Sequence, residues 1–405
     1  MKFFCDDSVT LFHGDCLEVL AGLPDGSVDS VVTDPPYGLA FMGNKWDTFS
    51  AVEFQAWCGL WAAECLRVLK PGGHMLAFGG TRTFHRLAVA VEDAGFEIRD
   101  SIAWLYGSGF PKSLDVSKAI DKAAGAERAK VPATGGLANN KNLNDDGWAK
   151  IGQPNPMMDS GTPASDAAQQ WQGWGTALKP AFEPIVVARK PLDAKTVAAN
   201  VLAHGTGALN IDGSRVGGAF ESGWSKSGSK ASENTSMSGA NYARDPKPDN
   251  AAGRWPANVV LDESQAAALD LQSGVSKSSG VINRWDDGAK PFGGGAGHEY
   301  TSVRGVADEG GASRFFYTAK ANKKERPAVG GVTHPTVKPL ALMQYLVRLV
   351  TPVGGVVLEP FAGSGATVEA AILEGFDVIA VEREESYLPL VVERVKRAKG
   401  LMVEE

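Results

Sequence analysis

The sequence predicts an α/β protein with one Rossmann-like, largely parallel sheet and a long insertion in its middle. Segments typical of strands and helices alternate through residues 9–106, and the same alternation returns over 340–399. This alternation is the pattern of a parallel sheet with helices on both faces. The stretch between is rich in Gly, Ser, Asn, Asp and Trp and has weak periodicity. Because neither end supplies a full sheet, we expect the two ends to build one sheet together.

The elements of the N-terminal part follow from hydrophobic spacing. Short apolar runs predict strands, and apolar residues three and four positions apart predict helices. A Lys-Pro-Gly-Gly segment at 70–73 ends the longest helix. The predicted strands cover 9–12, 29–33, 74–78 and 97–106, one helix begins over 15–20, and two more cover 51–69 and 83–94.

The C-terminal part adds strands and helices of the same kinds. Its predicted strands cover 355–359 and 377–382, and its predicted helices cover 340–349, 366–374 and 387–399. The apolar segment 181–190 is expected to be an antiparallel edge strand of the same sheet. With that strand the sheet has seven strands.

The middle of the chain gives weaker signals. Two long stretches, 107–178 and 191–326, contain scattered Trp, Phe and Tyr residues that indicate a small folded element with flexible arms. The alternative, for segments such as 219–251, is a disordered surface loop. We assign 1–106 and 331–405 to the two halves of the sheet domain and 107–330 to the insertion.

Charge and composition limit the classes of function. The net charge is −7, yet Lys and Arg outnumber Asp and Glu by three over 111–330. Phosphate contacts are therefore expected in the middle, although an ordinary mixed surface explains the same count. No apolar run is long enough for a membrane span, and the acidic residues near position 6 do not suit a secretory signal, so we expect a cytoplasmic protein. The four cysteines lack metal-site spacing, and no metal is expected.

The first motif with chemical content is Asp34-Pro35-Pro36-Tyr37, directly after a predicted strand. The Asp34 carboxylate and the Pro35 carbonyl form a pair of acceptors that can hold both hydrogens of an exocyclic base amine. The prolines stiffen the loop, and Tyr37 offers a face on which an extruded base can stack. The alternative is a strand followed by a Pro-Pro turn, in which Asp and Tyr only cap and pack.

The second motif is a glycine turn between a strand and a helix. Gly363 and Gly365 allow a ligand to approach the backbone at the start of the helix, and Glu382 ends the next strand, where it can accept ribose hydroxyls. The third glycine of a dinucleotide site is absent, because Val368 stands there. A mononucleoside cofactor such as S-adenosylmethionine therefore fits better than NAD. The candidate cofactor residues of this motif are Glu359, Phe361, Gly363, Ser364, Gly365, Thr367 and Glu382.

The third motif is His334-Pro335-Thr336-Val337-Lys338-Pro339, before a predicted helix. Lys338 and the Thr336 hydroxyl are expected to meet the carboxylate at the methionine end of the cofactor. His334 has two interpretations, a general base or, more often for a loop histidine beside proline, a structural residue.

These motifs and their order resemble the amino-DNA methyltransferases of the β arrangement, in which the catalytic motif precedes the cofactor motif. The resemblance covers both ends of the chain. It implies a circularly permuted seven-stranded methyltransferase sheet, S-adenosylmethionine as methyl donor, double-stranded DNA as substrate and an inserted target-recognition region. It also implies that Asp34 contacts the cofactor side and that Asp15 and Cys16 lie near the cofactor adenine. Many members form homodimers, so a homodimer is a further expectation.

Adenine N6 is the target that the resemblance favours, since cytosine-N4 members more often carry Ser where Asp34 stands. Cytosine N4 stays as the alternative, because the same acceptors serve any exocyclic amine. Methylation at cytosine C5 needs a Pro-Cys nucleophile, and no cysteine here follows a proline. An NAD-linked oxidoreductase leaves Asp34 to Tyr37 without a role, and a non-catalytic DNA-binding protein leaves both motifs without one.

Overall fold

A computed structural model of the chain describes residues 1–39, 47–109, 111, 113–132, 157–217, 253–278, 281–285, 299–303, 308–319 and 325–400. The chain divides into two compact units. One contains Met1–Gly107 with Phe182–Glu405, and the other is Ser108–Ala181. The predicted loop 219–251 lies outside the described residues.

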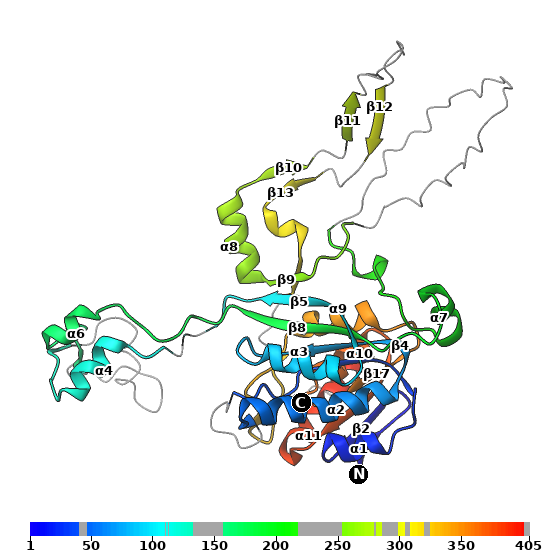
Figure 1. Ribbon diagram of the computed structural model, residues 1–405, viewed down its shortest axis with the longest axis horizontal. Coiled ribbons are helices and arrows are strands. Elements are labelled where there is room, and N and C mark those ends of the chain that lie inside the picture. Colours follow the sequence, from blue (N-terminus) through cyan, green and yellow to red (C-terminus); the bar gives the residue numbers. More distant parts are fainter. Residues whose placement is uncertain are drawn as a thin grey trace. The chain divides into compact units, whose positions relative to one another are not determined.

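A ten-stranded sheet forms the centre of the first unit (Figure 1). Its strand order is β1-β2-β18-β17-β3-β4-β8-β5-β9-β14. All of these strands run parallel except β1 and β8, which are antiparallel to their neighbours. The bounds are β1 Lys2–Cys5, β2 Val9–His13, β3 Val28–Thr33, β4 Leu69–Phe78, β5 Glu97–Leu105, β8 Phe182–Arg189, β9 Val259–Asp262, β14 Tyr317–Ala319, β17 Val356–Glu359 and β18 Asp377–Glu382.

The seven predicted strands are all present and adjacent, from β2 to β5. The segment 181–190 is antiparallel as predicted, but its placement at the edge was wrong, because β8 lies between β4 and β5. The far side of β5 pairs with β9, and β9 pairs with β14. The predicted insertion therefore supplies three strands of this sheet, where one was expected.

Helices cover both faces of the sheet. The helices α1 (Cys16–Ala21), α2 (Ala51–Val68) and α3 (Phe84–Asp93) bury side chains in one apolar cluster. The helices α9 (Leu340–Val350), α10 (Ala366–Leu373) and α11 (Leu388–Ala398) bury theirs in the other. Neighbouring residues of β3 point to opposite faces, since Val31 belongs to the first cluster and Val32 to the second.

The sheet changes its winding direction between β17 and β3. From β17 the chain passes through α10 to β18, on the side of β1. From β3 it passes through α2 to β4, on the side of β14. In open α/β sheets the crevice outside the carboxyl ends of two such strands is where ligands bind. Both candidate loops, one after each strand, start at this point.

The second unit, Ser108–Ala181, has its own small framework. Helices α4 (Val116–Ala123) and α6 (Asp166–Gln170) pack together, and β6 (Lys130–Pro132) pairs with β7 (Met157–Asp159). The buried Asp121 carboxylate joins these parts by accepting hydrogen bonds from Arg128 (2.7 Å) and from the Ser165 hydroxyl (2.7 Å). A folded element in this part of the chain agrees with the prediction.

The remaining elements belong to the first unit. They are α7 Val197–His204, α8 Glu263–Ser273, β10 Ser276–Ser278, β11 Val281–Trp285, β12 Glu299–Val303, β13 Asp308–Gly310, β15 Ala328–Val329 and β16 Val332–Thr333. Strand pairs β10–β13, β11–β12 and β15–β16 are separate two-stranded ribbons. In the part of the chain that the structure describes, no helix combines the length and apolarity that crossing a membrane requires.

Gly365, which precedes α10, is fixed by packing. Its φ is +81°, and an added Cβ would lie 3.0 Å from Val391 Cα in α11. We expect Gly365→Ala to reduce the free energy of unfolding by ~1–2 kcal/mol for the left-handed backbone and ~1–3 kcal/mol more for overpacking. Urea unfolding of this variant measures the sum of the two losses in the free energy of unfolding.

Gly375 is the matched control for this change. Its φ is +79°, and no atom lies within 4 Å of an added Cβ. Gly375→Ala should therefore show the backbone cost alone. Equal losses for the two variants would contradict the packing role of Gly365.

Candidate active site

The two motif loops meet at the ends of neighbouring strands. Strand β3 pairs in parallel with β17, with Val31 opposite Leu358. Asp34 follows β3 directly, and Pro360 follows β17 directly. The loops are more than 300 positions apart in the sequence, yet the register of two adjacent strands brings them to one edge of the sheet.

Glu359, at the end of β17, links both loops. Its carboxylate accepts hydrogen bonds from the Thr33 hydroxyl (2.5 Å) and the Thr367 hydroxyl (2.5 Å), and from the Phe361 amide (3.0 Å). The side chain is buried. Burial raises the pKa of Glu359 to about 8, even though its three donors favour the charged form. These hydrogen bonds hold the two loops together, and cofactor binding by Glu359 stays a prediction.

Asp34, Tyr37 and Glu183, all half-buried, form a polar cluster with the buried Lys338. The Tyr37 hydroxyl lies 2.8 Å from Asp34 Oδ1 and 3.0 Å from Glu183 Oε2. The Lys338 ammonium lies 2.6 Å from Asp34 Oδ2, 3.1 Å from the Tyr37 hydroxyl and 3.3 Å from Glu183 Oε2. Lys338 also lies over the rings of Tyr37 and Phe78, with its ammonium 5.4 and 4.8 Å from their centroids.

The charges of this cluster follow from its burial and its partners. Burial alone would lower the pKa of Lys338, but Asp34 and Glu183 outweigh it and raise the pKa to about 12. Burial and the same two carboxylates raise the pKa of Tyr37 well above its usual value. At neutral pH Lys338 is therefore an ammonium ion and Tyr37 a neutral phenol.

The contacts of Lys338 within the protein are with the Asp34 cluster. Its ammonium contacts Asp34, Tyr37 and Glu183, and the expectation that it meets the carboxylate of a cofactor stays a prediction. The side chain is buried beside two acids, and each ion pair offsets the cost of removing these charges from water. Thr336, by contrast, is exposed.

The glycine turn is shaped by Glu382, the last residue of β18. The Gly363 amide donates to Glu382 Oε2 (2.6 Å), and the Glu384 amide donates to Oε1 (2.7 Å). Gly363 has a φ of +50°. The absence of a side chain leaves room for the His334 ring, because a Cβ added at Gly363 would lie 3.2 Å from His334 Nε2. His334 also meets Tyr387 edge to face, with ring centroids 4.6 Å apart. The structure thus supports packing as a role for His334.

The other predicted residues are divided between this edge and the core. The Gly14 amide donates to the Glu382 carbonyl (3.0 Å), which brings Asp15 beside the glycine turn. The Asp15 carboxylate caps α1 by accepting from the Leu17 amide (2.9 Å). Phe361 packs on Trp57 and Trp61, with ring centroids 5.5 Å apart in both pairs. Cys16, Pro35, Ser364 and Thr367 are buried, and Pro36 is half-buried.

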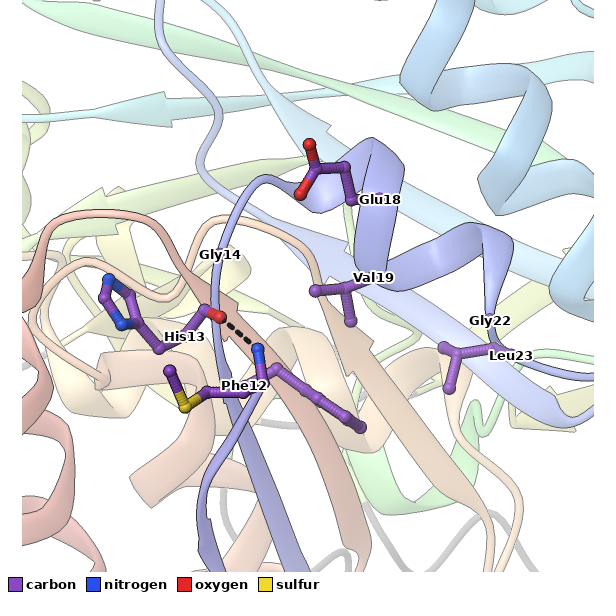
Figure 2. Close-up of a pocket in the computed structure, with 8 residues that line it drawn as sticks. Phe12, His13, Gly14, Glu18, Val19, Gly22 and Leu23 are labelled. Atoms are coloured by element: carbon purple, nitrogen blue, oxygen red, sulfur yellow. Dashed lines mark hydrogen bonds between the residues drawn. The ribbon is translucent and has the colours of Figure 1, made fainter.

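A pocket of about 390 Å³ lies next to Gly14, between the end of β2 and α1 (Figure 2). His13, Val19 and Leu23 are among its lining residues. None of the lining residues belongs to Asp34–Tyr37 or to the glycine turn. The pocket therefore borders the segment expected near a cofactor adenine and is separate from the Asp34 cluster.

A family model described as DNA methylase, of the N6/N4 methyltransferase type, matches residues 28–393. The chain belongs to this DNA methylase family. The match covers the Asp34 loop, the glycine turn and everything between them. The NAD-linked oxidoreductase alternative is wrong, since both motifs fall within one methylase match.

Two curated relatives of the methylase are type II methyltransferases of Haemophilus influenzae. M.HindIII is 21% identical over 95% of this chain and 94% of its own length. M.HinfI is 32% identical over 24% of this chain and 31% of its own length. Among solved structures, the PvuII DNA methyltransferase, described as cytosine-N4-specific, overlaps with a TM-score of 0.46 at 14% identity over 97% of this chain and 88% of that one.

Glu183 is the residue of the methylase cluster that sequence reasoning missed. It lies in β8, where Pro184 and Ile185 follow it. The available signal was one acidic residue near the start of a mostly apolar strand. Within the described residues, no group of three His, Cys, Asp or Glu side chains is arranged to hold a metal ion.

The raised pKa of Glu359 makes the stability of the methylase depend on pH. The ordinary pKa of 4.5 applies to the unfolded chain, and the folded value is about 8. Between these values the folded state binds the extra proton, so stability is lost as pH rises and levels off above the folded value. This carboxyl contributes a slope of at most ~1.4 kcal/mol per pH unit.

We expect Glu359→Gln to remove that part of the slope in urea unfolding between pH 5 and 8. Glu92→Gln, an exposed change on α3, is the control and should keep the slope of the original protein. Parallel pH profiles for the two variants would show that Glu359 is already ionised throughout this range.

Proposed function

We propose that this DNA methylase transfers a methyl group from S-adenosylmethionine to N6 of adenine in double-stranded DNA. The observation that carries the proposal is the meeting of the Asp34 loop with the glycine turn, through the three hydrogen bonds of Glu359. A base amine held at Asp34 then lies at the same sheet edge as a cofactor held at the turn. Direct transfer requires this proximity.

Asp34 and Pro35 are the amine-binding groups in this proposal. The exocyclic amine is a poor nucleophile because its lone pair is delocalised into the ring. A carboxylate and a carbonyl that accept its two hydrogens let the nitrogen rehybridise toward attack. Each carboxylate oxygen has two lone pairs, so Asp34 can accept from the substrate while it remains bonded to Lys338 and Tyr37.

Residues around the glycine turn fit the cofactor. Glu382 offers a carboxylate at the end of β18, Gly363 gives a left-handed turn before α10, and Asp15 lies beside them. An acid in this position can accept ribose hydroxyls, and the helix start favours a negative group. When bound, S-adenosylmethionine supplies an electrophilic methyl group and leaves as a neutral thioether. The exposed Thr336 is a candidate for its methionine end.

The first residue of the tetrapeptide supports adenine as the target. Asp34 is paired with Lys338, whereas cytosine-N4 members of the resembling family more often use a serine there. The adenine must leave the duplex to reach this edge, and Tyr37 is the stacking candidate. Cytosine N4 is the alternative for the same acceptors.

The middle of the chain is proposed to recognise DNA. Lys and Arg exceed Asp and Glu over 111–330, and phosphate attraction supplies most sequence-independent affinity. Ser108–Ala181 is a separate compact unit and exposes Trp171 and Trp174, whose rings meet edge to face at 5.1 Å. Because β8, β9 and β14 belong to the sheet, the recognition region is smaller than 107–330. A homodimer is proposed from the family resemblance alone.

Product analysis separates the two targets. Duplex DNA incubated with the protein and S-adenosylmethionine, then digested to nucleosides, should yield N6-methyladenine. This expectation rests on the family resemblance, in which cytosine-N4 members more often have Ser where Asp34 stands. N4-methylcytosine as the only product would reassign the target and leave the methylase assignment in place.

Asp34→Asn tests the amine-binding role. Loss of the anionic acceptor should slow single-turnover methyl transfer by ~10²–10⁴-fold, the usual contribution of such a group. The affinity for S-adenosylmethionine in calorimetry should stay within about threefold, because the contacts of Asp34 are with Lys338 and Tyr37.

Asp93→Asn is the control for this experiment. Asp93 is exposed at the end of α3, and its change should leave transfer unaltered. An Asp34→Asn enzyme as fast as the control would remove Asp34 from the reaction.

A further inference from the structure

Glu183 reaches the active-site edge because β8 runs against its neighbours. The start of an antiparallel strand lies beside the ends of parallel ones, and Glu183 is the second residue of β8. Opposite it in β5 is Trp104. The Glu183 side chain is 19% exposed. A carboxylate in this setting needs partners, and those it has are Tyr37 and Lys338.

The Tyr37 hydroxyl lies at hydrogen-bond distance from two carboxylates, 2.8 Å from Asp34 and 3.0 Å from Glu183. A phenol has one proton to donate and otherwise accepts. With both acids ionised, the phenol can donate a hydrogen bond to only one of the two carboxylates. Both contacts become hydrogen bonds when either acid takes up one proton, because the phenol then accepts from that acid and donates to the other.

Lys338 is paired with both acids and lies closer to one of them. The Lys338 ammonium is 2.6 Å from Asp34 and 3.3 Å from Glu183. Its attraction therefore stabilises ionised Asp34 more than ionised Glu183.

We propose that Glu183 is the final acceptor of the proton that the amine loses on methylation, and that Tyr37 passes this proton on from Asp34. The inference rests on the proposed function, since it needs a base amine at Asp34. Lys338 sets the direction by keeping Asp34 charged, so the proton comes to rest on Glu183. None of the described residues assigned above to amine or cofactor binding has the role of final proton acceptor.

The N–H bond of the methylated, positively charged amine breaks, its electrons return to nitrogen, and the proton bonds to the Asp34 carboxylate. Asp34 then donates its proton to the Tyr37 oxygen as the Tyr37 proton moves to Glu183 Oε2. Asp34 is again an anion, Tyr37 is again a neutral phenol, and Glu183 is a carboxylic acid. After product release Glu183 loses its proton to water.

Glu183→Gln tests the relay, because a glutamine accepts a hydrogen bond from Tyr37 and cannot take up the proton. We expect the rate of methyl transfer at saturating DNA and cofactor to fall ~10- to 100-fold, toward the lower range of acid–base contributions. KM for DNA and the calorimetric affinity for S-adenosylmethionine should change by less than about threefold. Glu92→Gln, on the exposed side of α3, is the matched control.

Tyr37→Phe keeps the ring and breaks the relay at its centre. It should slow transfer as much as Glu183→Gln does, and the double variant should be no slower than Tyr37→Phe alone. This non-additivity separates a relay from a supporting role, in which independent losses would multiply. If Glu183→Gln unfolds at the assay temperature, the Tyr37→Phe rate alone decides: an unchanged rate overturns the relay.

The possible results of these experiments distinguish a failure of the proton relay from a failure of the proposed function. An active original enzyme with a Glu183→Gln variant of equal rate would refute the relay and leave the methylase function intact. Multiplying losses in the double variant would likewise overturn it. An original enzyme that transfers no methyl group to any DNA would instead refute the proposed function.

Discussion

The site depends on the buried carboxylate of Glu359. Its bonds to the hydroxyls of Thr33 and Thr367 join a residue next to Asp34 to the helix that follows the glycine turn. A hydrogen bond of this kind contributes about 0.5–1.5 kcal/mol net, and a buried carboxyl group left without its partners costs about 1–3 kcal/mol. The two loops therefore cannot separate without leaving this carboxylate unsatisfied. The pairing of β3 with β17 sets their distance, and Glu359 sets their alignment.

The segment from His334 to Lys338 connects the two halves of the site. His334 packs against Gly363 in the glycine turn, and Lys338 binds Asp34 in the other loop. Only four positions separate these residues. A shift of this segment would alter the glycine turn and the charge on the Asp34 cluster together. The four acidic residues at this edge of the sheet have different roles. Glu382 shapes the glycine turn, Glu359 joins the two loops, and Asp34 and Glu183 share Lys338.

Local patterns predicted the sheet well, because strands and helices repeat with fixed periods. The strand 377–382 has the same bounds in the structure, and the other six predicted strands are present. The order of the strands in the sheet could not be predicted in the same way. An apolar segment has the same pattern at an edge and inside a sheet, so the place of β8 could not be read from it. Strands β9 and β14, with four and three residues, are too short to show a period.

Only part of the site could be predicted from the sequence, because short motifs show contiguous residues and not the partners that the fold brings to them. The residues of Asp34–Tyr37 and of the glycine turn are contiguous in sequence, so their spacing carries information. The partners of a charged side chain are not contiguous: Lys338 meets Asp34 from 304 positions away, and Glu183 meets Tyr37 from 146 positions away. Such contacts depend on the antiparallel direction of β8 and on the path of the loop before α9, which no short motif encodes.

A crystal structure of the protein with S-adenosylmethionine bound tests the central claim most directly. The ribose should lie at Glu382, the cofactor body along the Gly363 turn, and the methyl group should point to the edge where Asp34 and Pro35 follow β3. A cofactor seated in the pocket beside α1, with its methyl group turned away from Asp34, would contradict this claim.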